Sequence, residues 1–267
     1  MSDETFPEHY GTGYERERLA EGSSRIEFAR TKELLRRFLP SAPATILDVG
    51  GGPGVYAAWL ADEGYQVHLV DALPLHVEQA TAAAQDRDPS FTVELGDARS
   101  LAQDDSSYDA VLMLGPLYHI TEREERVHAL AEAKRVLRPS GMVAAAAISR
   151  FASLLDGLLS GWLGNPAFDA IVERDLSEGQ HRNPTNRFEW FTTAFFHHPD
   201  ELRAEVEDAG LQFEALLGIE GPGWLLWERW DDFKGREDIL KAARAVEQEK
   251  SLIGASAHLL VIARNPW

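Results

Sequence analysis

The sequence predicts an α/β fold in which a mainly parallel sheet lies between two layers of helices. From residue 44 onward, short apolar runs alternate with longer patterns of helical period, and the connections between them are short. This alternation favours a parallel sheet, because right-handed crossovers between its strands place helices on both faces. A chain of 267 residues can bury one sizeable core, so we expect a single domain over residues 1–267.

The elements are expected in the following order. Residues 1–43 form an N-terminal helical cover, because the apolar residues of 25–39 recur at helical spacing and Pro40 ends the pattern. The core spans residues 44–150, and its last helix starts near Thr121, which has capping-box spacing to Glu124. Its strands are expected at 46–50, 66–71, 91–97, 109–115 and 142–149, with helices at 55–64 and 74–85.

The last third departs from this alternation. A helix at 198–210 leads to strands at 211–219 and 257–264. Between these elements, residues 151–197 and 221–255 do not fit the sheet, and they contain five of the seven tryptophans. Because neither segment carries an alternating pattern of its own, we expect insertions that act as a lid, with loops at GNPAF and EGPGW, and no second domain.

Composition excludes several classes of function. The formal net charge of −18 disfavours a salt-driven grip on nucleic acid or on an anionic membrane. No apolar run approaches the ~20 residues of a membrane span, and the acidic start is unlike a signal peptide. The absence of cysteine excludes disulfides and thiol catalysis and is compatible with a reducing compartment. We therefore expect a cytoplasmic protein, either a monomer or a homodimer.

A glycine-rich loop, DVGGGPG at 48–54, is the most informative motif because it joins a strand to a helix. Such loops let a ligand lie against the backbone beside the helix N-terminus. The dinucleotide fingerprint G-x-G-x-x-G fails from Gly50, since its third glycine would fall on Val55. From Gly52 only the G/A variant is met, at Ala57, and this register puts the turn inside the helix. The pattern D-x-G-x-G-x-G is met, and it suits a cofactor whose charged amino-acid tail lies over the glycines. Asp71, 21 residues after Gly50, stands where a ribose-binding acid belongs.

At this point the sequence resembles the class I S-adenosylmethionine-dependent methyltransferases. ILDVGGGPG, HLVDALP, LGDARSL, YDAVLMLGPLYHI and RVLRPSGMVAAAAIS are similar to five motifs of that family, in the same order along the chain. The resemblance implies a Rossmann-like three-layer sandwich with a seven-stranded sheet and an antiparallel last strand. It also implies S-adenosyl-L-methionine as cofactor and S-adenosyl-L-homocysteine as product.

The resemblance assigns a role to each motif. Asp71 would hold the ribose hydroxyls, Asp97 would accept from the adenine amino group, and Asp48 would meet the ammonium of the cofactor. The cofactor-binding residues implied in this way are Asp48, Gly50, Gly52, Gly54, Asp71, Ala72, Leu73, Asp97, Ala98, Leu114, Gly115 and, in the N-terminal cover, Tyr10.

The methyl-transfer side is expected at Gly115-Pro116-Leu117-Tyr118-His119. Methyltransferases that modify amino groups of bases carry Asn/Asp-Pro-Pro-Tyr there, and this sequence departs from that pattern. His119 and Tyr118 are the candidate catalytic residues, because an imidazole can take a proton at neutral pH. Two other interpretations stay open for His119, which are capping of the next helix and contact with the cofactor carboxylate.

The aromatic insertion at 151–197 supplies the candidate acceptor-binding residues, which are Trp190, Phe191 and Arg187. Aromatic side chains on loops over a rigid sheet are typical of pockets for apolar or planar ligands. A core role for Trp190 is the alternative. No metal site is expected, since His197 and His198 are adjacent and their side chains diverge.

We therefore expect transfer of a methyl group to a small organic molecule with apolar or aromatic surface. A peptide or protein methyltransferase is the first alternative, because a wide groove also uses aromatic side chains. A non-catalytic, S-adenosylmethionine-binding regulatory protein is the second, because the fold alone does not determine function.

Overall fold

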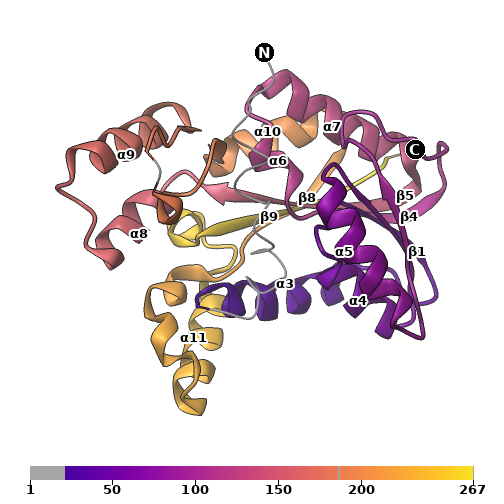
Figure 1. Cartoon of the computed structure of the whole chain (residues 1–267), viewed down its shortest axis with the longest axis horizontal. Coiled ribbons are helices and arrows are strands. Elements are labelled where there is room, and N and C mark those ends of the chain that lie inside the picture. Colours follow the sequence, from indigo (N-terminus) through magenta and orange to yellow (C-terminus); the bar gives the residue numbers. More distant parts are fainter. Residues whose placement is uncertain (1–21, 186, 267) are drawn as a thin grey trace.

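The computed structural model describes residues 22–185 and 187–266. At its centre the strands follow the order β3-β2-β1-β4-β5, and β9 and β8 continue the sheet beyond β5 (Figure 1). The first five are parallel, whereas β9 is antiparallel to both β5 and β8, as the family resemblance implies. Their bounds are β1 Thr45–Val49, β2 Gln66–Asp71, β3 Thr92–Leu95, β4 Tyr108–Met113, β5 Leu137–Ser149, β8 Gln212–Gly218 and β9 His258–Arg264.

Helices cover both faces of the sheet, which confirms the predicted α/β class. One face packs against α3 (Ser24–Phe38), α4 (Val55–Asp62) and α5 (Pro74–Gln85), and the other against α7 (Arg123–Val136) and α10 (Pro199–Asp208). The strands alternate between the two cores, because successive side chains of a strand point to opposite faces. In β4, for example, Val111 belongs to the core under α7 and Leu112 to the core under α4.

The sheet of the described residues has nine strands, so the expected seven were too few. The additional strands, β6 (Gln180–His181) and β7 (Ala194–His197), come from the segment expected not to fit the sheet. On one side of β5, β4 pairs only as far as Ala145, so Ile148 and Ser149 are free to pair there with β7 in parallel register. Backbone groups at the end of the long strand β5 thereby gain partners that no local pattern announces.

The predicted capping box at Thr121 is wrong. Residues Pro116–His119 form a short helix, α6, and α7 then begins at Arg123 with Glu122 as its N-cap and no side-chain capping bond. The carbonyl of Thr121 instead accepts a hydrogen bond from the buried guanidinium of Arg126. This bond holds residue 121 outside the helix.

The lid segment is more helical than its composition suggested. It contains α8 (Ala152–Ser160) and α9 (Pro166–Glu178), which project from the sheet in Figure 1. GNPAF, expected as a loop, contains the start of α9, because the side chain of Asn165 accepts a hydrogen bond from the N–H of Ala167. Among the described helices, none combines the length and the apolar character that crossing a membrane requires.

The second aromatic segment packs against the N-terminal helix. It forms η2 (Gly221–Trp230), α11 (Phe233–Val246) and η3 (Ile253–Ala255). Trp224 and Trp230 are buried against Ile26 of α3 and Ile239 of α11. EGPGW, expected as a loop, therefore leads into a 3₁₀ helix whose tryptophans complete a small core.

Candidate functional site

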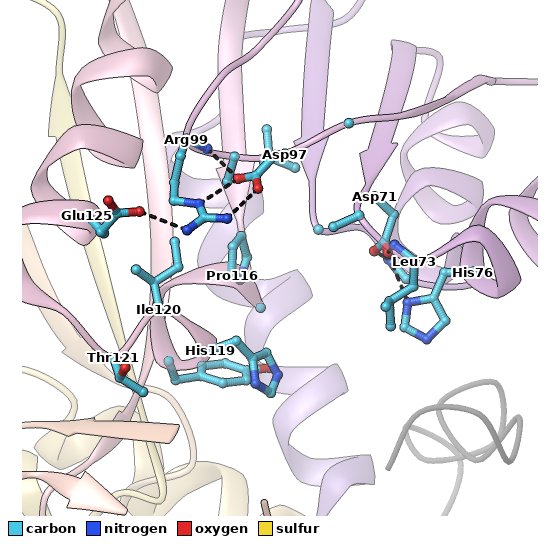
Figure 2. Close-up of a pocket in the computed structure, with 18 of the residues that line it drawn as sticks. Asp71, Leu73, His76, Asp97, Arg99, Pro116, His119, Ile120, Thr121 and Glu125 are labelled. Atoms are coloured by element: carbon cyan, nitrogen blue, oxygen red, sulfur yellow. Dashed lines mark hydrogen bonds and ion pairs between the residues drawn. The ribbon is translucent and has the colours of Figure 1, made fainter. Parts of the chain in front are cut away.

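A cavity of about 620 Å³ opens at the carboxyl edge of the sheet (Figure 2). Ligands of open α/β sheets bind at this edge, and the volume suits a small organic molecule. The described residues that line it are Val49, Gly50 and Gly52 at the end of β1 and after it, Asp71, Ala72, Leu73 and His76 at the end of β2 and after it, Gly96, Asp97, Ala98 and Arg99 after β3, Gly115, Pro116, Tyr118, His119, Ile120, Thr121, Glu122 and Glu125 after β4, and Thr193.

The glycine loop approaches the cavity with its bare backbone. Gly50 has φ 69°, and a Cβ there would lie 2.8 Å from the Cδ of Pro116, so only glycine fits. Gly52 also has a positive φ, 57°, but a Cβ at that position would meet no atom within 4 Å. Gly54, the N-cap of α4, packs against Phe91 and is not a lining residue. The open space beside Gly52 leaves room for a ligand against the loop.

Asp71 braces this loop from the end of β2. One carboxylate oxygen accepts a hydrogen bond from the backbone N–H of Leu73. The ring nitrogen Nδ1 of His76 lies 3.1 Å from the same oxygen and donates to it when that nitrogen carries a hydrogen. The other oxygen accepts from the N–H of Gly52 at 2.9 Å. Asp71 is only 5% exposed, yet it lines the cavity. The acid is therefore oriented by the chain itself.

Asp48 lies beneath the loop, away from the cavity wall. It is 1% exposed, and neither of its carboxylate oxygens has a hydrogen-bond partner among the described residues. Burial, with a smaller contribution from the charge of Asp71, raises the pKa of Asp48 to about 7. A cation near this acid would lower its pKa again, because the ionised form would gain a partner.

Asp97 is held by an arginine that the sequence reasoning missed. Arg99 donates from its guanidinium to both oxygens of Asp97, at 2.9 and 2.6 Å, and also to Glu125 at 2.8 Å (Figure 2). These hydrogen bonds hold the pKa of Asp97 below its usual value. Ala98, which stands between Asp97 and Arg99 in the sequence, also lines the cavity. The available signal was a basic residue two positions after a candidate ligand-binding acid.

Tyr118 and His119 line the cavity from α6. Their ring centroids are 4.6 Å apart, and the ring of Phe191 lies 6.4 Å from Tyr118 and 6.1 Å from His119. Gly115 precedes them at the cavity wall, whereas Leu114 packs into the core under α4. The structure thus brings three aromatic rings together at the end of β4, one of them from the lid.

A buried ion pair positions the segment that carries these rings. Arg126 and Glu205 are each 1% exposed and pair at 2.6 Å, and Arg126 also donates to the carbonyls of Ile120 and Thr121. His197 of β7 lies 3.2 Å from the same carboxylate. The link joins the cavity mouth to α10 and β7.

Trp190 and Arg187 do not line the cavity. Trp190 is 3% exposed and packs with Phe168, Ile171 and Val172 inside the lid, and the guanidinium of Arg187 lies over its ring at 4.8 Å. Among the described residues of the segment 151–197, Thr193 is the one that lines the cavity. No described residue of the segment 221–255 lines it. Tyr10 lies outside the described residues.

The adjacent histidines have separate roles in the fold. His197 is fully buried, and burial lowers its pKa. His198 caps α10 through a capping box with Glu201. Thr193, His76 and Glu125 are further lining residues that no motif indicated.

Comparison with known proteins gives consistent matches. Residues 46–141 match a family model described as a methyltransferase domain. Methyltransferase GfsG of Streptomyces halstedii is 33% identical over 204 residues, which is 75% of this chain and 63% of that protein. The chain therefore spans less than two thirds of this curated relative.

Two further matches cover a larger share of the matched protein. The ubiquinone/menaquinone biosynthesis C-methyltransferase UbiE of Acidiphilium cryptum is 30% identical over 207 residues, which is 73% of this chain and 79% of that protein. The crystal structure of an S-adenosylmethionine-dependent methyltransferase from Mesorhizobium loti has a TM-score of 0.61 at 16% identity, covering 90% of this chain and 99% of that one. The match to the Mesorhizobium loti structure shows the fold.

Proposed function

The chain belongs to the class I S-adenosylmethionine-dependent methyltransferases, and from this we propose that it transfers a methyl group from S-adenosylmethionine to a small organic acceptor. The observation that carries the proposal is the composition of the cavity wall. A bare glycine backbone, two acids at consecutive strand ends and a pair of aromatic side chains face one space of about 620 Å³. Such a wall offers a cofactor half and an acceptor half in one cavity.

The residues of the cofactor half fit S-adenosylmethionine. The open position beside Gly52 admits an amino-acid tail, and Asp71 offers a braced carboxylate for a ribose diol. We place the adenine between Ala72 and Leu73 on one side and Asp97 and Ala98 on the other, all at the cavity wall. When bound, the cofactor supplies an electrophilic methyl group on a sulfonium.

Tyr118 and His119 would form the acceptor half of the cavity wall, with the ring of Phe191 beside them. Methyl transfer is a one-step displacement, so these rings would exclude water and hold the acceptor in line with the methyl group. The imidazole of His119 would take the proton of a weakly acidic acceptor at neutral pH. Its alternative role, a contact with the cofactor carboxylate, requires no proton transfer.

The acceptor is proposed to be apolar or aromatic. The rings at the end of β4 suit a planar molecule, and the name of the Acidiphilium relative refers to ubiquinone and menaquinone biosynthesis. The charge of −18 disfavours nucleic acid as substrate. We further propose a cytoplasmic location for this cysteine-free chain. We also propose that the chain is a monomer or a homodimer, and size-exclusion chromatography with light scattering measures this oligomeric state.

Two measurements test the proposed function. Calorimetry should show saturable binding of S-adenosylhomocysteine. Tight binding of NADH together with no binding of S-adenosylhomocysteine would refute the proposal. Release of S-adenosylhomocysteine is then measured against panels of phenols, quinols, amines and peptides. Turnover of a small planar compound supports the proposal, turnover of peptides alone favours a peptide methyltransferase, and binding without any turnover favours a regulatory protein.

A further inference from the structure

The loop between β6 and β7 contains a residue whose backbone is strained. Phe191 has φ 63° and ψ −178°, a conformation that is populated almost exclusively by glycine. Among the described residues other than glycine, it shares a positive φ only with Ser106 and Ser140. Strain of this kind persists where the surrounding structure enforces it, and it is common at functional sites.

Two side chains hold the peptide groups on either side of Phe191. Its own carbonyl accepts a hydrogen bond from Nδ2 of Asn183 at 2.8 Å. The preceding carbonyl, that of Trp190, lies 2.8 Å from Nε2 of His181, and this nitrogen donates because a carbonyl oxygen can only accept. The relative orientation of these two peptide groups defines φ and ψ of Phe191. Asn183 and His181 together therefore enforce the strained conformation.

Both of these side chains are themselves fixed. The second hydrogen of the Asn183 amide is donated to the carbonyl of Arg187 at 2.9 Å. The side chain of His181 is 1% exposed, and its Nδ1 lies 2.9 Å from the carboxylate of Asp175. The imidazole of His181 also stacks on the ring of Phe196 with 4.6 Å between the centroids. Neither side chain can turn away from the loop without losing a further interaction.

The strained residue lies beside the acceptor half of the cavity wall. The ring of Phe191 is 6.1 Å from that of His119 and 6.4 Å from that of Tyr118, and both of these residues line the cavity. Two positions further along the chain, Thr193 lines the same cavity. The backbone conformation of one residue thus decides where an aromatic ring and a threonine side chain lie relative to the cavity.

We propose that Asn183 and His181 are positioning residues for the acceptor half, which they influence through Phe191. Glycine would adopt this backbone without strain but would supply no ring, so a phenylalanine there indicates that the ring is needed. The inference rests on the proposed methyl transfer, in which the acceptor must lie in line with the methyl group. A displacement of about 1 Å in such a site can lower the rate ~100-fold.

The first test measures the strain. Phe191→Gly and Phe191→Ala both remove the ring, and at an ordinary position the glycine variant is the less stable, because its unfolded chain is more flexible. At φ 63° the order should reverse, so Phe191→Gly should have the higher melting temperature by circular dichroism. An equal or lower melting temperature of Phe191→Gly would show an unstrained backbone and would overturn the proposal.

The second test observes the imidazole of His119 directly by NMR. In protein labelled with ¹³C at histidine Cε1, the signal of His119 is assigned by its absence in His119→Gln. Phe191→Leu should move this signal, because the ring current of Phe191 is lost. Asn183→Ala should move it in the same direction by at least half as much. An unmoved signal in folded Asn183→Ala would contradict the proposal.

A matched control comes from the same lid. Asn165→Ala also removes a hydrogen bond between an asparagine side chain and the backbone, here to the N–H of Ala167 at 3.0 Å, and should leave the His119 signal in place. An equal movement in this control would refute a specific role of Asn183. If Asn183→Ala does not fold, His181→Phe takes its place, because it keeps an aromatic ring and removes the hydrogen bond to the Trp190 carbonyl.

Turnover separates this proposal from the proposed function. Once an acceptor is identified, Asn183→Ala should lower kcat about tenfold at unchanged affinity for S-adenosylhomocysteine. A moved His119 signal with unchanged kcat would rule out a role of Asn183 in the reaction. If the wild-type protein binds no S-adenosylhomocysteine, the proposed function fails, whereas the melting temperatures and the His119 signal still decide how Phe191 is held.

Discussion

The backbone N–H of Gly52 donates a hydrogen bond of 2.9 Å to the carboxylate of Asp71, which ties the glycine loop after β1 to the acid at the end of β2. Leu73 and His76 contact the other oxygen of the same carboxylate. The chain therefore sets the loop and the acid in position before any ligand binds. Such preorganisation lowers the ordering cost of binding.

Replacing this acid should weaken cofactor binding. In Asp71→Asn, one carboxylate oxygen becomes an amide donor that faces either Gly52 N–H or Leu73 N–H, so the brace is lost together with an acceptor for ribose hydroxyls. We expect the affinity for S-adenosylhomocysteine to fall by ~1–3 kcal/mol, about 5- to 150-fold. Calorimetry measures this affinity, and Asp86→Asn, at an exposed aspartate, is the control. Equal affinities in both variants would remove Asp71 from the binding site.

Arg99 should compete with the ligand for Asp97. Both side chains of this ion pair are nearly half exposed, at 45% and 44%, so breaking it costs only ~0–1 kcal/mol. Arg99→Gln should therefore tighten S-adenosylhomocysteine binding up to about fivefold, because Asp97 becomes available to the adenine amino group. Arg203→Gln, which breaks a similarly exposed pair with Glu207, is the control. A tenfold weakening would instead mean that Arg99 itself contacts the ligand.

Asp48 should make stability depend on pH. Its pKa is about 7 in the folded chain, against the ordinary aspartate value of 3.8 in the unfolded chain. Between these values the folded state keeps a proton that the unfolded state has released, so stability falls as pH rises and then levels off. Relative to Asp48→Asn, wild-type protein should lose about 2–3 kcal/mol of unfolding free energy between pH 5 and pH 7. Urea unfolding at several pH values checks this, and parallel pH profiles would contradict it.

Two neighbouring aromatic residues of the lid should behave differently. Trp190 is buried within the lid, so Trp190→Ala should destabilise the protein by about 3–5 kcal/mol, measured by thermal or urea unfolding. Phe191 is half-buried beside His119, so Phe191→Ala should mainly lower turnover at unchanged S-adenosylhomocysteine affinity. The reverse pattern would place the acceptor at Trp190.

His119 should be tested once an acceptor is found. His119→Gln should lower kcat about 100-fold if the imidazole is the base, and high pH should restore part of the loss for an acidic acceptor. Tyr118→Phe keeps the ring and removes the hydroxyl, so it separates packing from hydrogen bonding. If His119→Gln changes S-adenosylhomocysteine affinity and leaves kcat intact, the residue contacts the cofactor and is not the base.

Local pattern predicted much of the cavity wall. The alternation of strands and helices places the carboxyl ends of parallel strands at one edge, so Gly52, Asp71 and Asp97, each near a strand end, had to meet there. The periods of 2 and 3.6 residues that encode these elements are readable within short windows.

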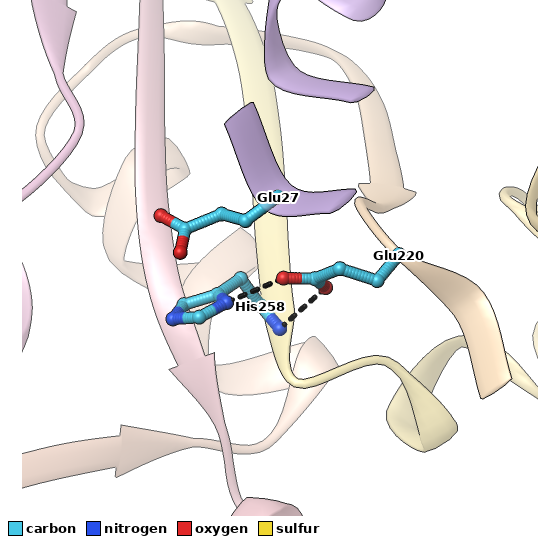
Figure 3. A group of neighbouring side chains, drawn as sticks. All are labelled: Glu27, Glu220 and His258. Carbon is cyan, nitrogen blue, oxygen red and sulfur yellow. Dashed lines mark hydrogen bonds and ion pairs between the residues drawn. The ribbon is translucent and has the colours of Figure 1, made fainter. Parts of the chain in front are cut away.

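Contacts between distant segments were decided only by the tertiary structure. The pairing of β7 with the end of β5, the burial of Trp190 and the meeting of Glu27, Glu220 and His258 (Figure 3) all join residues that no short window contains. What the sequence determined by itself is therefore the α/β order and the acids and glycines at its strand ends. Which side chains become wall or core was decided by packing, because burial and charge pairing depend on neighbours that only folding brings together.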